Sequence, residues 1–229
     1  MKTHSFNIQW PCELSDFLKQ KLLECAIEFH GIPDRALSAR VTQGGVFYIT
    51  KGIMSVSFSA ENTNSMNASL LGSGTWFGGS IMSASMSFNA TVDELLPVSF
   101  IYFPKDKIDK LALSNNEVYK WLYFSVLEVQ QDWLKSQLCS LYDRESRIVF
   151  SLLQIAKRLP SVQGSLVKID ISQKQLSQIT GISRPRLNEV LKELEAQKEL
   201  SLERGSIHIL DIPALSQRIS HLDNDLPSQ

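Results

Sequence analysis

The spacing of apolar and polar residues changes along this chain of 229 residues, from a strand-like pattern to a helical one. Between residues 40 and 103 the apolar runs are short, and glycine or polar residues separate them, which is typical of strands joined by turns. The predicted strands cover residues 46–49, 53–58, 69–71, 90–92 and 98–103. Many short strands at this spacing favour an antiparallel barrel or roll. Ahead of them, the helical spacing of apolar residues predicts an amphipathic helix over residues 14–29.

A long helix is predicted over residues 117–141, because this segment contains neither Gly nor Pro. It carries two adjacent apolar rows: Phe124, Leu127, Leu134, Leu138 and Leu141 in heptad-like spacing, and Leu122, Val126, Val129 and Trp133 beside them. A helix with two apolar rows must bury two faces. We expect one face to pack on the sheet and the other on the same helix of a second subunit, as a coiled coil. Burial of both faces within a single domain is the alternative.

The segment from Ser172 to Gln197 has the pattern of a helix-turn-helix. Ser172 and Gln175 have the spacing of a capping box, which predicts the start of a helix. Gly181 lies in a tight turn, where glycine tolerates a positive φ. Ser183 is then expected to cap a second helix, whose buried stripe consists of Leu187, Val190, Leu191 and Leu194. A further helix is expected over residues 145–159, and residues 200–209 read as a β-hairpin that turns at Arg204–Gly205, which would form a wing.

The side of the second helix that points away from the stripe carries the candidate chemistry. In a helix-turn-helix this helix enters the major groove, and its N-terminal residues meet base edges. We call this side the groove face; it consists of Arg184, Pro185, Asn188, Glu189 and Lys192. Arginine can donate twice to guanine, asparagine can pair with adenine, and glutamate can accept from cytosine. Phosphate contacts are expected from Ser172, Ser183, Arg186 and the helix N-termini, and Gln173 is a further candidate DNA-binding residue.

The distribution of charge agrees with this interpretation. The net charge of the chain is −1, to which residues 1–142 contribute −2, residues 143–222 contribute +3 and residues 223–229 contribute −2. Positive charge therefore gathers around the predicted DNA-binding segment. We expect a sensor domain with the long helix over residues 1–142, a winged helix-turn-helix over residues 143–222, and an acidic, flexible tail over residues 223–229.

Other classes of protein find little support in the sequence. Three widely spaced cysteines and four separated histidines lack metal-ligand spacing, so no metal and no cofactor is predicted. No histidine lies between residues 40 and 103, which argues against a cupin-type enzyme. The most apolar run, residues 95–103, is far shorter than the about 20 residues that span a bilayer. Without an apolar core of signal-peptide length near the N-terminus, we expect a cytoplasmic protein that does not enter a membrane.

Several motifs resemble those of the Crp–Fnr family of transcription regulators (the cyclic-AMP receptor and fumarate–nitrate regulator superfamily). Residues 181–188 (GISRPRLN) and 191–195 (LKELE) are similar to its DNA-binding domain. Residues 47–52, 74–78 and 103–105 resemble its sensor barrel more loosely. The resemblance implies an α+β fold: an N-terminal cupin-like antiparallel β-roll, a long dimerisation helix, and a C-terminal winged helix-turn-helix. It also implies a homodimer on two-fold symmetric double-stranded DNA, with RNA polymerase and an unidentified small molecule as candidate partners.

The resemblance fails at the residues that bind cyclic nucleotides in this family. A Glu that meets the ribose stands where this chain has Gly79, and an Arg that meets the cyclic phosphate stands near Phe88-Asn89. A buried phosphate beside Phe88 would lack a charged partner, which is costly. The possible effector pocket (Phe77, Gly78, Gly79, Ser80, Phe88, Asn89 and Ala90) is therefore expected to reject cyclic AMP. Many relatives also carry Arg where this chain has Glu189, so its target site should be atypical.

The sequence thus predicts a dimeric, sequence-specific DNA-binding transcription regulator of the Crp–Fnr type, controlled by an effector other than cyclic AMP, and not an enzyme. The alternative is a ligand-binding regulatory module that acts through protein partners without binding DNA. Salt-dependent binding to duplex DNA would distinguish the two, because phosphate contacts release counterions.

Overall fold

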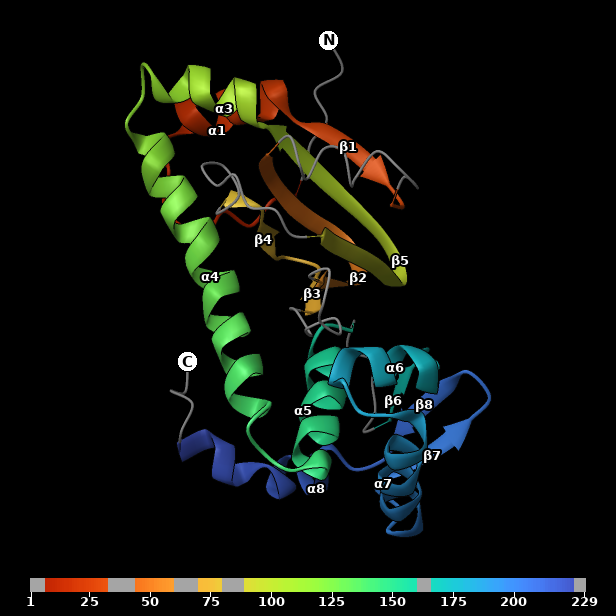
Figure 1. Ribbon diagram of the computed structural model, residues 1–229. Coiled ribbons are helices and arrows are strands. Elements are labelled where there is room, and N and C mark those ends of the chain that lie inside the picture. The colour runs from red at the N-terminus through yellow and green to blue at the C-terminus, as the bar shows by residue number, and fades with distance from the viewer. Residues whose placement is uncertain (1–6, 33–43, 60–69, 80–88, 160–165, 225–229) are drawn as a thin grey trace. The chain divides into compact units, whose positions relative to one another are not determined.

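The computed structural model divides the chain into two compact units (Figure 1). The first consists of residues 1–54 and 71–132, and the second of residues 55–70 and 133–229. Within them, the structure describes residues 7–32, 44–59, 70–79, 89–159 and 166–224. None of the described helices is long and apolar enough to cross a lipid bilayer.

The predicted antiparallel sheet is present in the first part of the chain. Its strands are β1 (Ile27–His30), β2 (Gly45–Ser59), β3 (Leu70–Gly72), β4 (Trp76–Phe77) and β5 (Asn89–Pro104). The strand order is β1-β5-β2-β3, with β4 paired to β2. Strand β1 pairs antiparallel with β5, and β4 pairs antiparallel with β2.

Two predicted strand breaks are wrong. Residues 46–49 and 53–58 belong to one strand, β2, and residues 90–92 and 98–103 belong to another, β5. The potential breakers face each other: a Cβ built on Gly52 would lie 2.2 Å from the carbonyl oxygen of Pro97. Gly52 has a φ of +85°, which only glycine adopts at low cost. Gly52 of β2 therefore leaves room for the backbone at Pro97 of β5. Strand β2 continues past Gly52, and strand β5 continues past Pro97.

The predicted N-terminal helix is shorter than its apolar pattern suggested. Helix α1 (Asp16–Cys25) begins at Ser15, whose side chain accepts a hydrogen bond from the Leu18 amide. Residues 27–30 form β1 instead of a last helical turn, and this part of the prediction is wrong. The cause is a long-range contact, because Ile27 pairs with Tyr102 and Phe29 with Phe100 across the sheet.

Helices α1 and α3 (Lys105–Ala112) lie side by side at one end of this sheet (Figure 1). Their buried side chains, Leu18, Leu22 and Ile108, join a core with Trp76 of β4 and Trp121 of the next helix. Ser15 donates two hydrogen bonds to the Glu117 carboxylate, from its amide at 2.7 Å and from its hydroxyl at 2.5 Å. These bonds lower the pKa of Glu117 and join the start of α1 to the start of the next helix.

The long helix, α4, spans Glu117–Cys139, two residues fewer than predicted. Val118, Trp121 and Ser125 are fully buried, and they form a row that the apolar pattern had not singled out. Members of the two predicted rows are half-buried or exposed in the single chain. The exposed apolar side chains of α4 are Tyr119, Tyr123, Trp133 and Leu134.

The second unit contains the predicted helices and wing. Its elements are α5 (Arg144–Lys157), β6 (Val167–Ile169), α6 (Gln173–Thr180), α7 (Arg184–Ala196), β7 (Leu200–Glu203), β8 (Ser206–Ile209), α8 (Ile212–Arg218) and the short 3-10 helix Ser220–Asn224. The hairpin β7–β8 turns at Arg204–Gly205, as predicted, and Gly205 has a φ of +86°. The structure adds β6, which extends the hairpin to a three-stranded sheet in the order β6-β8-β7, and helix α8. Neither had been predicted.

Candidate nucleic-acid interface

Helix α6 and the turn after it have the geometry expected from the sequence. The Ser172 side chain accepts from the Gln175 amide at 3.2 Å, and the Gln175 side chain accepts from the Ser172 amide at 2.9 Å. These two bonds form the predicted capping box. Gly181 has a φ of +66° and a ψ of +18°, the left-handed conformation that ends the helix. The turn therefore follows from local sequence.

Helix α7 buries the predicted stripe, because Leu187, Val190, Leu191 and Leu194 are all less than 10% exposed. Ser183 occupies the N-cap position, but its side chain makes no capping hydrogen bond. Pro185 lies in the first turn, where a missing N–H costs little. The first amides of α7 remain without a side-chain cap, so they can donate to an anion.

The structure brings the groove face together on one side of α7. Arg184, Pro185, Glu189 and Lys192 are exposed, and so is Arg186, whereas Asn188 is half-buried. Gln173 of α6 donates from Nε2 to Oδ1 of Asn188 at 3.3 Å. An exposed, cation-rich surface with one amide held by the preceding helix is suited to reading base edges.

A groove of about 260 Å³ lies between the starts of α6 and α7 and the wing. Its lining includes Ser172 and Gln173 from α6, Arg184 from α7, and Arg204, Gly205 and Ser206 from the wing. Two guanidinium groups and the N-terminal turn of α6 thus border one concave surface. Such a surface is suited to negatively charged phosphate groups. Arg204 is a member of this groove that had been predicted only as a turn residue.

Two arginines that sequence reasoning missed hold this unit together. Arg147 of α5 donates from Nη2 to the carbonyl of Thr180, the last residue of α6. Arg218 of α8 pairs with Glu199 at 2.7 Å and with Glu145 at 2.5 Å, which raises the pKa of Arg218. The partners lie 19 to 73 residues apart in the chain, so no local pattern could have indicated them.

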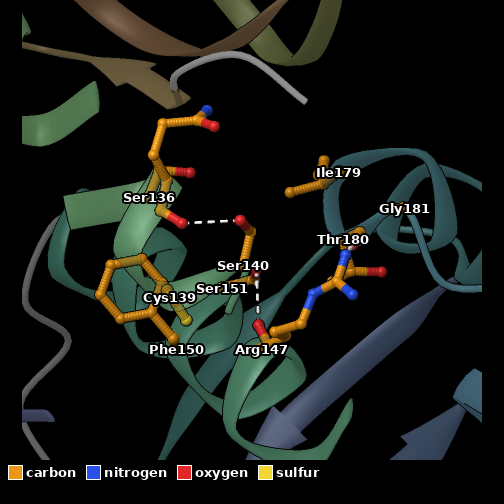
Figure 2. A pocket seen from close by; sticks show the side chains of 10 residues that line it. Ser136, Cys139, Ser140, Arg147, Phe150, Ser151, Ile179, Thr180 and Gly181 are labelled. Carbon is orange, nitrogen blue, oxygen red and sulfur yellow. Dashed lines mark hydrogen bonds between the residues drawn. The ribbon is translucent and has the colours of Figure 1, made fainter. Parts of the chain in front are cut away.

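A second pocket, of about 290 Å³, lies beside Arg147 in the same unit. Figure 2 shows the Arg147 side chain next to Thr180 and the Phe150 ring on the opposite side of this pocket. Burial raises the pKa of the Cys139 thiol in its wall to about 11. The thiol is therefore protonated at neutral pH and is a poor nucleophile or metal ligand. The described residues include no cluster of three or more potential metal ligands.

The predicted effector pocket is only partly described. Phe77 is buried in β4, Gly78 and Gly79 follow it, and Asn89 and Ala90 begin β5, whereas Ser80 and Phe88 lie outside the described residues. Gly79 packs directly on α4: a Cβ built on it would lie 2.9 Å from a methyl carbon of Val126. Any side chain at this position would therefore begin in contact with α4, whose Ser125 and Leu122 also lie within 4 Å of the built Cβ.

Comparison with known proteins identifies the C-terminal part of the chain by sequence and the rest by fold. Residues 146–218 match the family model of a Crp-like helix-turn-helix domain. Among solved structures, a Crp/Fnr family protein from Eubacterium rectale has a TM-score of 0.69 at 14% identity, and the alignment covers 90% of this chain and 95% of that one. The c-di-GMP-responsive global regulator CLP of Xanthomonas campestris has a TM-score of 0.64 at 15% identity, covering 85% and 99%.

A Crp family transcriptional regulator from Thermus thermophilus has a TM-score of 0.65 at 14% identity, covering 85% of this chain and 96% of that one. No curated protein sequence matches the chain. Identities this low establish a shared fold, whereas the family model identifies the C-terminal domain by its sequence. Residues 146–218 are therefore a Crp-like helix-turn-helix domain, in a chain that has the fold of the Crp/Fnr family of transcriptional regulators.

Proposed function

We propose that this protein is a sequence-specific, DNA-binding transcription regulator that reads the major groove with the groove face of α7. The observation that carries the proposal is the exposed, cation-rich face of α7 beside the wing, within a Crp-like helix-turn-helix domain. Arg184 lies in the first turn of α7, and this N-terminal end of the helix would enter the major groove of DNA. Its fork-shaped guanidinium suits the O6 and N7 atoms of guanine.

The remaining polar groups of this surface divide into two roles. Asn188, Glu189 and Lys192 would meet bases, whereas Ser172, Ser183 and Arg186 would meet phosphates and fix the register. Gln173 would act beside them, because its Nε2 donates to Oδ1 of Asn188 at 3.3 Å and so holds that amide in place. Arg204 of the wing, which lines the 260 Å³ groove on the protein surface, would be a further phosphate contact.

The protein would act as a homodimer on a two-fold symmetric site. Exposed apolar side chains along α4, among them Trp133 and Leu134, support a second copy of this helix as the partner. The two copies of α7 would meet half-sites about 34 Å apart, one turn of DNA. A small molecule would act by shifting the population between two arrangements of the copies.

Replacing Arg184 tests the assignment of base recognition. The target site is first obtained by selecting bound duplexes from a random pool. Arg184→Ala is expected to weaken binding to this site by about 1–3 kcal/mol, because one bidentate base contact disappears, and to weaken binding to random duplex less. Arg184→Lys is the matched control: it keeps the charge and loses the fork, so specificity should fall while the salt dependence stays close to wild type. Fluorescence anisotropy at several salt concentrations measures both. Equal losses on both duplexes would make Arg184 a phosphate contact only.

Cyclic AMP is not the effector in this proposal. Isothermal titration calorimetry is expected to detect no binding at micromolar cyclic AMP, because Gly79 and Phe88 offer no polar or charged side chain to the ribose and the phosphate. Gly79→Glu should not create binding either, since Phe88 still offers the phosphate no charged partner and the new Cβ would lie 2.9 Å from a methyl carbon of Val126. A genuine cyclic-AMP receptor, titrated in the same buffer, provides the positive control. Micromolar affinity for cyclic AMP in this protein would overturn the assignment.

A further inference from the structure

Glu189 has an unusual neighbour for a residue on the groove face. Its carboxylate oxygen Oε2 lies 3.5 Å from Nη1 of Arg144, which comes from the first turn of α5. Both side chains are more than half exposed. Arg186 and Lys192 lie one turn away on α7 itself, yet among the described residues Arg144 is the cation that forms an ion pair with this carboxylate. Residues from two different helices thus meet at the edge of the groove face.

The position of Arg144 gives no benefit to its own helix. The N-terminus of a helix carries a partial positive charge, so a cation in the first turn is unfavourable there. The cap of α5 is Asp143, which accepts from the Ser146 amide at 2.8 Å, and Glu145 in the same turn pairs with Arg218. Arg144 is therefore the residue of this turn whose interaction is directed toward α7.

The pair also resolves an electrostatic conflict on the groove face. A bare carboxylate that approaches DNA is repelled by the phosphates on both sides of the groove. An arginine beside it cancels this charge and restricts the carboxylate to the orientations that the ion pair allows. A carboxylate held in this way can accept a hydrogen bond from the amino group of cytosine. The pair is exposed and weak in water, but screening decreases as the groove face is covered by DNA.

We propose that Arg144 is a positioning residue for base recognition: it orients and neutralises Glu189, which then discriminates one base pair of the half-site. This inference rests on the proposed DNA-binding function and deepens it, because it assigns specificity to a residue outside the helix-turn-helix. Arg144 itself need not touch a base. Its effect should be confined to the base pair that Glu189 reads.

The experiment is a selection of bound duplexes from a random pool, followed by affinity measurements on the selected site and its single-base variants. Glu189→Ala first identifies the base pair whose discrimination depends on Glu189. Arg144→Ala is then expected to lower discrimination at that base pair by about fivefold to tenfold and to leave other positions unchanged. In the double variant, Arg144→Ala should add no further loss to that of Glu189→Ala. Arg144→Lys, which keeps the charge, should restore part of the discrimination.

Lys174→Ala is the matched control, because Lys174 is an exposed cation of α6 that forms no ion pair with any of the described residues, whereas Arg144 pairs with Glu189. It should weaken binding to all duplexes to a similar degree and leave discrimination unchanged. Thermal melting of each variant shows that the fold is retained. The inference fails if Arg144→Ala leaves discrimination at the Glu189 position intact, if the two losses are additive, or if Glu189→Ala changes no position. In all three cases the proposed function stands, whereas a wild-type protein that selects no duplex overturns both.

Discussion

Replacing Gly52 with alanine is expected to destabilise the first unit by about 3 kcal/mol or more. The new Cβ would lie 2.2 Å from the carbonyl oxygen and 2.7 Å from the carbonyl carbon of Pro97, and 2.8 Å from Cα of Val98. All three are backbone atoms in the middle of β5, so no side-chain rotation can relieve the overlap. The positive φ of +85° adds about 1–2 kcal/mol for any residue that has a Cβ, and overpacking typically costs about 1–3 kcal/mol.

Chemical denaturation followed by tryptophan fluorescence measures this loss. Three of the four tryptophans, Trp10, Trp76 and Trp121, belong to the first unit, so the signal reports mainly on its unfolding. Gly31→Ala is the matched control, because Gly31 has a φ of +77° but nothing within 4 Å of its built Cβ. The loss of stability in Gly31→Ala gives the cost of the positive φ alone, and the additional loss in Gly52→Ala gives the cost of the steric overlap. Equal losses in the two variants would show that β2 and β5 separate easily at this point.

The sequence predicted the helix-turn-helix well because its determinants are local. The capping box joins residues three apart, Gly181 needs only its own conformation, and the stripe of α7 repeats every three or four residues. Each of these patterns lies within a short stretch of sequence. The groove face followed directly, because fixing one side of a helix as buried leaves the other side exposed.

The sheet was predicted less well because its pairings are not local. Strand β4 has only two residues, Trp76 and Phe77, and it exists because they pair with Tyr48 and Phe47. Strand β1 was read as helix because its pairing partner lies about 70 residues away in β5. The contacts of Arg144 and Arg218 escaped prediction for the same reason. An alternating or helical pattern shows which faces are apolar, but it does not show what covers them.

The N-terminal part of α4 is held by a cluster of aromatic side chains around Trp121. This residue is fully buried and contacts Trp76 at a ring-centroid distance of 5.6 Å and Phe103 at 5.5 Å, both edge to face. Among the residues that the structure describes, its buried indole Nε1 has no hydrogen-bond partner. Within this part of the chain the N–H group makes no conventional hydrogen bond, and its contacts with the neighbouring rings are only a weak substitute.

Trp121→Ala is expected to lower the free energy of unfolding by about 3–5 kcal/mol, the usual cost of removing a large buried aromatic side chain. Trp121→Phe should cost much less, about 1–2 kcal/mol, because it keeps most of the ring contacts and removes an unpaired donor. Far-ultraviolet circular dichroism during guanidinium unfolding measures both losses without depending on the replaced fluorophore. If Trp121→Phe costs as much as Trp121→Ala, the indole N–H has an acceptor, and a buried water molecule bound to Nε1 is then the explanation to test. The difference between the two variants thus separates ring packing from hydrogen bonding in the contact that attaches the N-terminal part of α4 to the sheet of β1–β5.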